Sequence, residues 1–125
     1  MKRQILILNY GSGNVKSVLN ICKYLEENTI ISNDIDNIKK CSHIILPGVG
    51  SFKSSMDKVK KNLPLKEIMD QIIVKKKPIL GICVGMQLLA NTGYEFGEYT
   101  GLGLIDGSVK KLETNEYPLP NIGWN

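Results

Sequence analysis

The chain has 125 residues, of which 42% are hydrophobic, and its 16 Lys and Arg against 12 Asp and Glu give a net charge of +4. A chain of this length can bury about two-thirds of its unfolded surface as one globular domain. The charge is too weak and too dispersed for a nucleic-acid groove. No apolar run is long enough for a secretory signal or a membrane span. With three cysteines and no C-x-x-C spacing, we expect a reduced, cytoplasmic protein without nucleic-acid or membrane partners.

Short apolar runs alternate with segments of helical periodicity over most of the chain. Continuous apolar strands between helices are typical of a parallel sheet that is covered on both faces. The predicted fold is therefore α/β and doubly wound, with a mostly parallel sheet and helices on both faces. The expected strands are residues 4–9, 29–32, 43–46 and 79–82, and the expected helices follow residues 14, 33, 51, 64 and 83.

Individual positions refine this pattern. Cys22 lies on the apolar face of the first helix and is expected to be core packing. The basic run 75–77 follows a helical segment, where the carbonyl end of a helix favours positive charge. The helix after Cys83 is expected to end near Gly93. Beyond it, residues 101–105 and 109–112 are typical of short hairpin or edge strands.

The segment Gly81-Ile82-Cys83-Val84-Gly85 has the form of a nucleophile elbow, with sulfur in place of a hydroxyl. The sharp strand-to-helix turn strains the backbone of the nucleophile, and side chains two residues before and after it would collide. Unpaired N–H groups at the start of the helix favour a thiolate. A lone G-x-C-x-G also occurs by chance, but here it follows an apolar strand and precedes a helical pattern.

An attack of sulfur on an amide carbon needs two donors for the developing oxyanion. The Val84 N–H is the expected first donor. The second is expected from the loop Pro47 to Gly50, because it follows a strand and the carboxyl ends of parallel strands meet at one edge. Taken alone, Pro-Gly-Val-Gly is more often an ordinary turn.

Other chemistry is not supported by the sequence. The segment 11–16 lacks the third glycine of a dinucleotide fingerprint, since that position holds Lys16. The chain has one histidine and no phosphate-binding loop of the G-x-x-x-x-G-K type. We therefore expect neither a metal nor another cofactor.

Four motifs occur in order: Asn9-Tyr10-Gly11-Ser12-Gly13-Asn14, Leu46 to Gly50, Gly81 to Leu89, and Gly123-Trp124-Asn125. On these motifs the chain resembles the glutaminase subunits of imidazole glycerol phosphate synthases, which are class I (triad) glutamine amidotransferases with a flavodoxin-like fold. The likeness runs from the first strand to the last residue.

The resemblance implies hydrolysis of glutamine to glutamate and ammonia through a cysteine thioester. The ammonia would pass to a (β/α)8-barrel cyclase subunit in histidine biosynthesis. It further implies roles for single residues: Cys83 as nucleophile, Val84 with Gly48 and Val49 as oxyanion hole, Gly48 and Gln87 as glutamine-binding residues, and Tyr10, Asn14, Trp124 and Asn125 toward the cyclase.

Two positions depart from the family pattern. The family usually has aspartate where this chain has Asn9, and P-H-M-G-W-N where this chain has Pro120 to Asn125. Similar variants occur in paralogues that supply ammonia for amidation of surface-polysaccharide sugars. That acceptor is the alternative to the histidine pathway.

The family's catalytic histidine and glutamate, in a motif like H-P-E-K-S, have no counterpart in this sequence. His43 cannot replace them, because it begins a strand whose far end carries the loop, roughly 16 Å away at about 3.3 Å per residue. We therefore expect residues 1–125 to form the N-terminal portion of a single amidotransferase domain, inactive alone, with an unfinished sheet edge and exposed apolar surface.

Two further hypotheses remain open. One is a different elbow-cysteine hydrolase that accepts another amide or ester, and the other is a non-catalytic module that binds a partner through the same surface.

Overall fold

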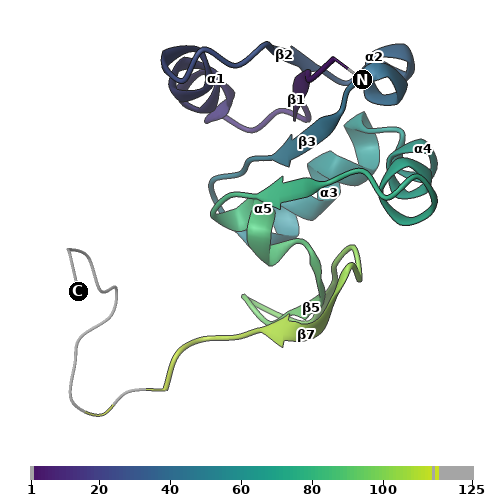
Figure 1. Ribbon diagram of the computed structural model, residues 1–125. Coiled ribbons are helices and arrows are strands. Elements are labelled where there is room, and N and C mark those ends of the chain that lie inside the picture. Colours follow the sequence, from purple (N-terminus) through teal and green to yellow (C-terminus); the bar gives the residue numbers. More distant parts are fainter. Residues whose placement is uncertain (1, 114, 116–125) are drawn as a thin grey trace.

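A computed structural model describes residues 2–113 and 115 of the chain (Figure 1). Helices and strands alternate as expected along the first part of the chain. The strands are β1 (Ile5–Leu8), β2 (Thr29–Ser32), β3 (His43–Leu46), β4 (Ile79–Gly81), β5 (Ala90–Gly93), β6 (Tyr99–Thr100) and β7 (Ile105–Val109). The helices are α1 (Val15–Tyr24), α2 (Ile35–Lys40), α3 (Phe52–Asn62), α4 (Leu65–Met69), the π-helix η1 (Asp70–Val74) and α5 (Val84–Gln87).

The main sheet is parallel and has the strand order β2-β1-β3-β4. The chain moves outward from β1 to β2 and then returns to add β3 on the other side of β1. The strand order therefore reverses between β1 and β3, which is where open α/β sheets bind their ligands, beyond the carboxyl ends of the strands.

Successive side chains of each strand point to opposite faces of the sheet, and different helices cover the two faces. On one face, Ile7 and Ile45 pack with Val18 and Cys22 of α1. On the other face the larger cluster includes side chains of α2, α3 and α4. The predicted doubly wound class with helices on both faces is confirmed, and so is Cys22 as a core residue.

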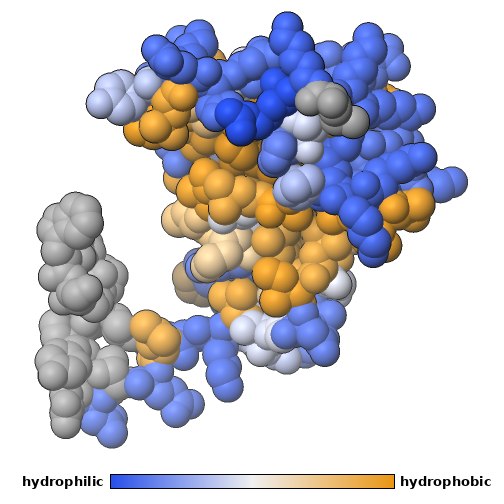
Figure 2. All heavy atoms as spheres, viewed as in Figure 1, coloured by the Kyte–Doolittle hydropathy of each residue, from blue (hydrophilic) through white to orange (hydrophobic). Residues whose placement is uncertain are grey.

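The sheet ends at β4 on one side, and the surface beside this strand is apolar. Leu80 is 56% exposed and lies in register with buried Ile45, on the face that α1 covers over β1. A hollow of about 190 Å³ lies there, lined in part by Ile5, His43 and Leu80. Figure 2 shows apolar side chains along the middle of the molecule, where β3, β4 and α5 lie in Figure 1. Within the described residues, the expected open edge and exposed apolar surface are present.

The helix after the elbow is shorter than predicted. It ends at Gln87, and Ala90 and Gly93, which we placed on this helix, belong to strand β5. Gly93 has a packing reason to be glycine, since an added Cβ would lie 2.5 Å from the ring of Phe52. Leu88, Leu89 and Ala90 are buried. A short apolar run of this kind suits a buried helix as well as a buried strand, so the sequence pattern did not distinguish the two.

The end of the described chain also differs from the prediction. Strand β5 pairs with β6 antiparallel and with β7 in parallel to form a second, small sheet. Residues 101–104 lie in a loop, and the strand is Ile105–Val109, which starts at the last residue of the first expected run, 101–105, and ends at the first residue of the second, 109–112. The backbone of Leu102 and Leu104 donates to Leu88 and Leu89, which ties this loop to the end of the elbow helix.

The second amphipathic helix is interrupted by a wider turn. Helix α4 passes into η1, in which the N–H of Lys75 donates to the carbonyl of Asp70, five residues earlier, at 3.1 Å. The extra residue in this turn rotates the following side chains. As a result Gln71 is buried, whereas the apolar Ile73 is exposed. The run 75–77 follows the end of η1, as expected, and Lys77 Nζ also donates to the last carbonyls of α2.

Candidate functional site

Cys83 lies between the end of β4 and the start of α5, with backbone angles φ 56° and ψ −123°. A non-glycine residue at positive φ is strained and remains so only where the surrounding structure holds it. The thiol is free and the residue is exposed. The predicted elbow, with an accessible sulfur on a strained turn, is therefore present.

Close packing explains the glycines on both sides of Cys83. A Cβ on Gly81 would lie 2.6 Å from the Cα of Met86, and a Cβ on Gly85 would lie 1.9 Å from the carbonyl oxygen of Leu46. The first turn of α5 thus rests directly on the backbone of β4 and on the end of β3. Val84 is the first residue of α5, where a backbone N–H has no acceptor within its own helix.

The loop Pro47 to Gly50 lies against the elbow. A Cβ on Gly48 would meet the Gly85 nitrogen at 2.9 Å and Val84 Cγ1 at 3.2 Å. Residues 47 and 48 are buried, whereas Val49 and Gly50 are exposed, and Gly50 has φ +101°. The two candidate oxyanion segments, around Gly48-Val49 and at Val84, therefore share one rim of the sheet with Cys83.

Tyr10 connects the first motif to this loop. Its phenol is only 1% exposed and donates to the carbonyl oxygen of Pro47 at 2.5 Å. Burial raises the pKa of the Tyr10 phenol, while the hydroxyls of Ser12 and Ser55 act in the opposite direction. We expected Tyr10 to face a partner protein; its side chain instead lies inside the fold, in the larger core cluster, where the phenol reaches Pro47 at the end of β3.

The other expected site residues lie as follows. Gln87 is the last residue of α5 and is half-buried. Asn14 precedes α1 and is also half-buried, and its side chain does not cap the helix. Trp124 and Asn125 are outside the described residues.

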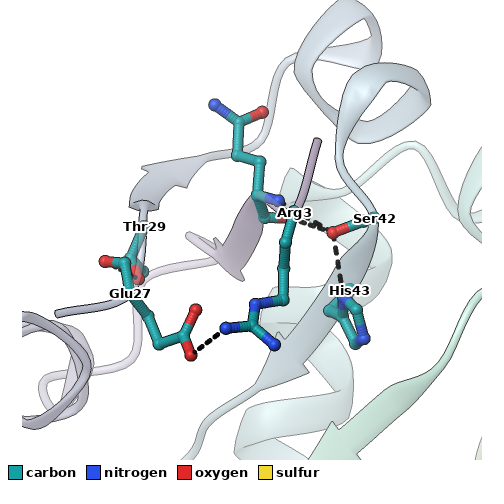
Figure 3. A network of polar contacts seen from close by, with 6 residues as sticks. Arg3, Glu27, Thr29, Ser42 and His43 are labelled. Carbon is teal, nitrogen blue, oxygen red and sulfur yellow. Dashed lines mark hydrogen bonds and ion pairs between the residues drawn. The ribbon is translucent and has the colours of Figure 1, made fainter. Parts of the chain in front are cut away.

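His43 lies at the opposite end of its strand from the loop Pro47 to Gly50. Its Nδ1 is 2.8 Å from the hydroxyl of Ser42, which also contacts the backbone of Gln4 (Figure 3). Nearby, Arg3 forms a surface ion pair with Glu27 at 2.7 Å. His43 therefore belongs to a network at the amino ends of the strands, as expected, and does not reach Cys83.

Two side chains that hold the site were not identified from the sequence. The carboxylate of Glu95 accepts a hydrogen bond at 3.2 Å from the Phe52 N–H, at the start of α3 and just after the loop. Asn62 Nδ2 donates to the Tyr10 carbonyl at 2.8 Å. Both bonds join residues more than forty positions apart, so no local pattern could have indicated them.

Residues 2–113 and 115 contain no cluster of three or more His, Cys, Asp or Glu side chains that could hold a metal ion. None of the helices in this part of the chain is long and apolar enough to cross a membrane.

Comparison with protein families gives a match over residues 6–122 to the model described as glutamine amidotransferase class-I. The sequence is 41% identical over 121 residues to "Imidazole glycerol phosphate synthase subunit HisH" of Oceanobacillus iheyensis, covering 97% of this chain and 59% of that protein. It is 43% identical over 123 residues to the protein of the same name from Lactococcus lactis, covering 98% and 60%. The chain thus spans about 60% of the length of these curated relatives.

Among solved structures, one titled "Crystal structure of glutamine amidotransferase" superimposes with a TM-score of 0.68 at 15% sequence identity. The match covers 82% of this chain and 54% of that one. At this identity the likeness concerns the fold alone, and it agrees with the parallel sheet and the helices on both faces.

Proposed function

Because the chain belongs to the class-I glutamine amidotransferase family, we propose that it carries the nucleophile and oxyanion half of a glutaminase. The observation that carries this proposal is the joint position of Cys83 and the loop Pro47 to Gly50. An exposed sulfur on a strained turn lies on the same rim as a glycine loop that touches the first turn of α5.

In the proposed reaction, the Cys83 sulfur attacks the side-chain amide carbon of glutamine. The carbonyl oxygen takes up the negative charge and is stabilised by backbone N–H groups of Val84 and of the Gly48-Val49 loop. The C–N bond then breaks, ammonia leaves with an added proton, and a thioester remains on sulfur. Water hydrolyses the thioester to glutamate and restores the thiol. Gly48 and Gln87 are proposed to hold the glutamine.

Proton transfer in both steps needs a general base. His43 is at the wrong end of its strand. We therefore propose that residues 1–125 are the N-terminal portion of the catalytic domain and have negligible turnover by themselves. The base would come from a segment equivalent to the further 40% of length that the curated relatives have.

The relatives carry the name of a synthase subunit, and we propose that the partner is a (β/α)8-barrel cyclase that receives ammonia for histidine biosynthesis in the cytoplasm. Asn14, beside the carboxyl end of β1, together with Trp124 and Asn125, would lie toward this partner. Tyr10 is no longer proposed as a contact. Because Asn9 and the segment 120–122 depart from the family pattern, a polysaccharide sugar is the alternative acceptor of the ammonia.

Labelling with a chloromethyl ketone analogue of glutamine tests the glutaminase proposal without requiring the base. We expect covalent modification of the chain at Cys83, located by peptide mass spectrometry, and protection by added glutamine. The control is the chloromethyl ketone of alanine, which has the same reactive group and lacks the glutamine-like skeleton. Equal labelling by both reagents would favour an elbow-cysteine hydrolase of other specificity.

A second experiment addresses turnover and the partner. We expect the chain of 125 residues to release no measurable glutamate, whereas the complete gene product with a barrel cyclase releases glutamate and transfers ammonia to the cyclase product. A complex that forms with the cyclase but never hydrolyses glutamine would favour the non-catalytic module.

A further inference from the structure

The phenol of Tyr10 and the carbonyl of Pro47 meet beneath the proposed oxyanion loop, at the reversal of strand order between β1 and β3. We propose that Tyr10 is a positioning residue of the reaction, which holds the Pro47–Gly48 peptide in the orientation that the oxyanion loop needs. This inference rests on the proposed glutaminase function. It assigns Tyr10 a role within the site in place of the expected contact with a partner.

The geometry of the peptide bond explains how a buried phenol acts on an outward-facing loop. A trans peptide is planar, and its C=O and N–H point in opposite directions. The phenol lies inside the fold and draws the Pro47 oxygen inward. The Gly48 N–H is therefore turned away from Tyr10, and the plane from which the chain continues through Gly48 is set.

Tyr10 is itself held firmly, so that it can act as a fixed point. Its backbone carbonyl accepts from Asn62 Nδ2 of α3 at 2.8 Å, and its side chain is buried at the junction of β1 and β3. Burial raises the pKa of the phenol, so it stays protonated at neutral pH and keeps its proton for donation. A fixed, neutral donor suits the task of orienting a carbonyl.

The loop between its two ends has few other restraints. Before it, the carbonyl of Leu46 accepts from the Ile82 N–H at 3.0 Å. After it, Glu95 and the hydroxyl of Ser51 hold the start of α3. Val49 and Gly50 between these points are exposed. The contact of Tyr10 with Pro47 therefore lies at the buried start of the loop, just before its exposed part.

Ser12 adds a second sign of a polar environment beneath the loop. Its hydroxyl is buried and lies near enough to the phenol to lower the pKa of Tyr10. Ser12 and Tyr10 come from one motif, Asn9 to Asn14, and this motif thus supports the loop from below.

The variant Tyr10→Phe removes the donor and keeps the buried ring in the core cluster. The matched control is Tyr99→Phe, because the Tyr99 phenol also donates to a backbone carbonyl, that of Phe96 at 3.1 Å, in an exposed part of the second sheet. Each purified full chain would be labelled at Cys83 with the glutamine chloromethyl ketone and, separately, with iodoacetamide. The ketone passes through an oxyanion before sulfur displaces chloride, whereas iodoacetamide reacts by direct displacement of iodide.

We expect Tyr10→Phe to slow labelling by the ketone by about tenfold, which is less than the roughly 10²–10³-fold loss on removal of an oxyanion donor itself, because Tyr10 acts only through the loop. Its rate with iodoacetamide should stay within about twofold of the wild type, and Tyr99→Phe should leave both rates within about twofold, as surface changes away from the site do. Equal loss with both reagents would indicate general damage to the fold and overturn the positioning role, as would an unchanged rate with the ketone. Failure of the wild type to prefer the glutamine reagent would instead overturn the glutaminase proposal itself.

Discussion

A Cβ atom on Gly85 would lie 1.9 Å from the carbonyl oxygen of Leu46, so the first turn of α5 packs directly on the end of β3. Backbone atoms cannot move aside as the end of a flexible side chain can. The substitution Gly85→Ala must therefore push α5 away from β3 and move Cys83 relative to the loop Pro47 to Gly50. We expect a loss of about 2 kcal/mol or more in the free energy of unfolding, at the upper end of overpacking costs, measured by urea denaturation.

The matched control is Gly13→Ala, because a Cβ on Gly13 meets no atom within 4 Å and its backbone does not require glycine. Its free energy of unfolding should change by less than about 0.5–1 kcal/mol. Equal effects of the two substitutions would show that the contact between Gly85 and Leu46 does not determine the packing of the elbow.

Cys83 is predicted to reduce the stability of the fold, because it occupies positive φ at 56°. Strain of this kind costs of order 1–3 kcal/mol, and glycine relieves it. We expect Cys83→Gly to be more stable than Cys83→Ala, by about 1 kcal/mol, in urea denaturation. Alanine keeps the strain while removing the sulfur, so the comparison isolates the backbone.

At Cys22 we expect the reverse order, with Cys22→Gly less stable than Cys22→Ala. Cys22 lies within helix α1 and is buried, and glycine in a helix is less stable than alanine by about 1 kcal/mol. If glycine were less stable than alanine at both positions, the turn at Cys83 would store no strain.

The fold class and the location of the nucleophile could be predicted from the sequence because both depend on local patterns. The four apolar runs became β1 to β4, and the glycines around Cys83 became an elbow. Strand β5 could not be predicted, because the apolar residues Leu88 to Ala90 fit the buried side of a helix as well as that of a strand. The contacts of Tyr10 with Pro47 and of Glu95 with Phe52 join distant positions, and only the folded chain brings them together.

The stability of the fold is expected to fall at alkaline pH. Burial raises the pKa of the Cys41 thiol above its ordinary value of 9.0, although Lys77 acts in the opposite direction, and burial raises that of the Tyr10 phenol above 10.0. Between the ordinary and the raised pKa, the unfolded chain releases a proton that the folded chain retains, so a rise in pH favours unfolding. The stabilisation is complete below pH 9 and is lost progressively above it.

Urea denaturation at a series of pH values from 7 to 11 measures this loss. One such group contributes a slope of at most about 1.4 kcal/mol per pH unit. We expect Cys41→Val to reduce the decline that begins near pH 9, and Tyr10→Phe to reduce the decline that begins near pH 10. Both variants should follow the slope of the wild type between pH 7 and 8. An unchanged alkaline slope in Cys41→Val would contradict the assignment to Cys41.

Leu80 on the edge strand β4 is predicted to promote self-association of the chain without stabilising it. Its side chain is 56% exposed on an apolar surface, beside a strand that has no neighbour on its outer side among the described residues. Exposed apolar patches and open strand edges favour aggregation. We expect Leu80→Lys to lower the weight-average mass in sedimentation equilibrium at high concentration. Its free energy of unfolding should change by less than about 0.5 kcal/mol, as for other exposed positions.

The neighbouring substitution Ile79→Lys separates exposure from position on the strand. Ile79 is partly buried and packs against the larger core cluster on the other face of the sheet. A lysine there must either bury its charge or open the contact, and we expect a loss of about 2 kcal/mol or more in the free energy of unfolding. Because the two residues are adjacent, a general intolerance of charge on β4 would affect both equally. If Ile79→Lys lowers the free energy of unfolding and Leu80→Lys does not, the face of β4 on the α1 side is open to solvent and the face on the α3 side is packed.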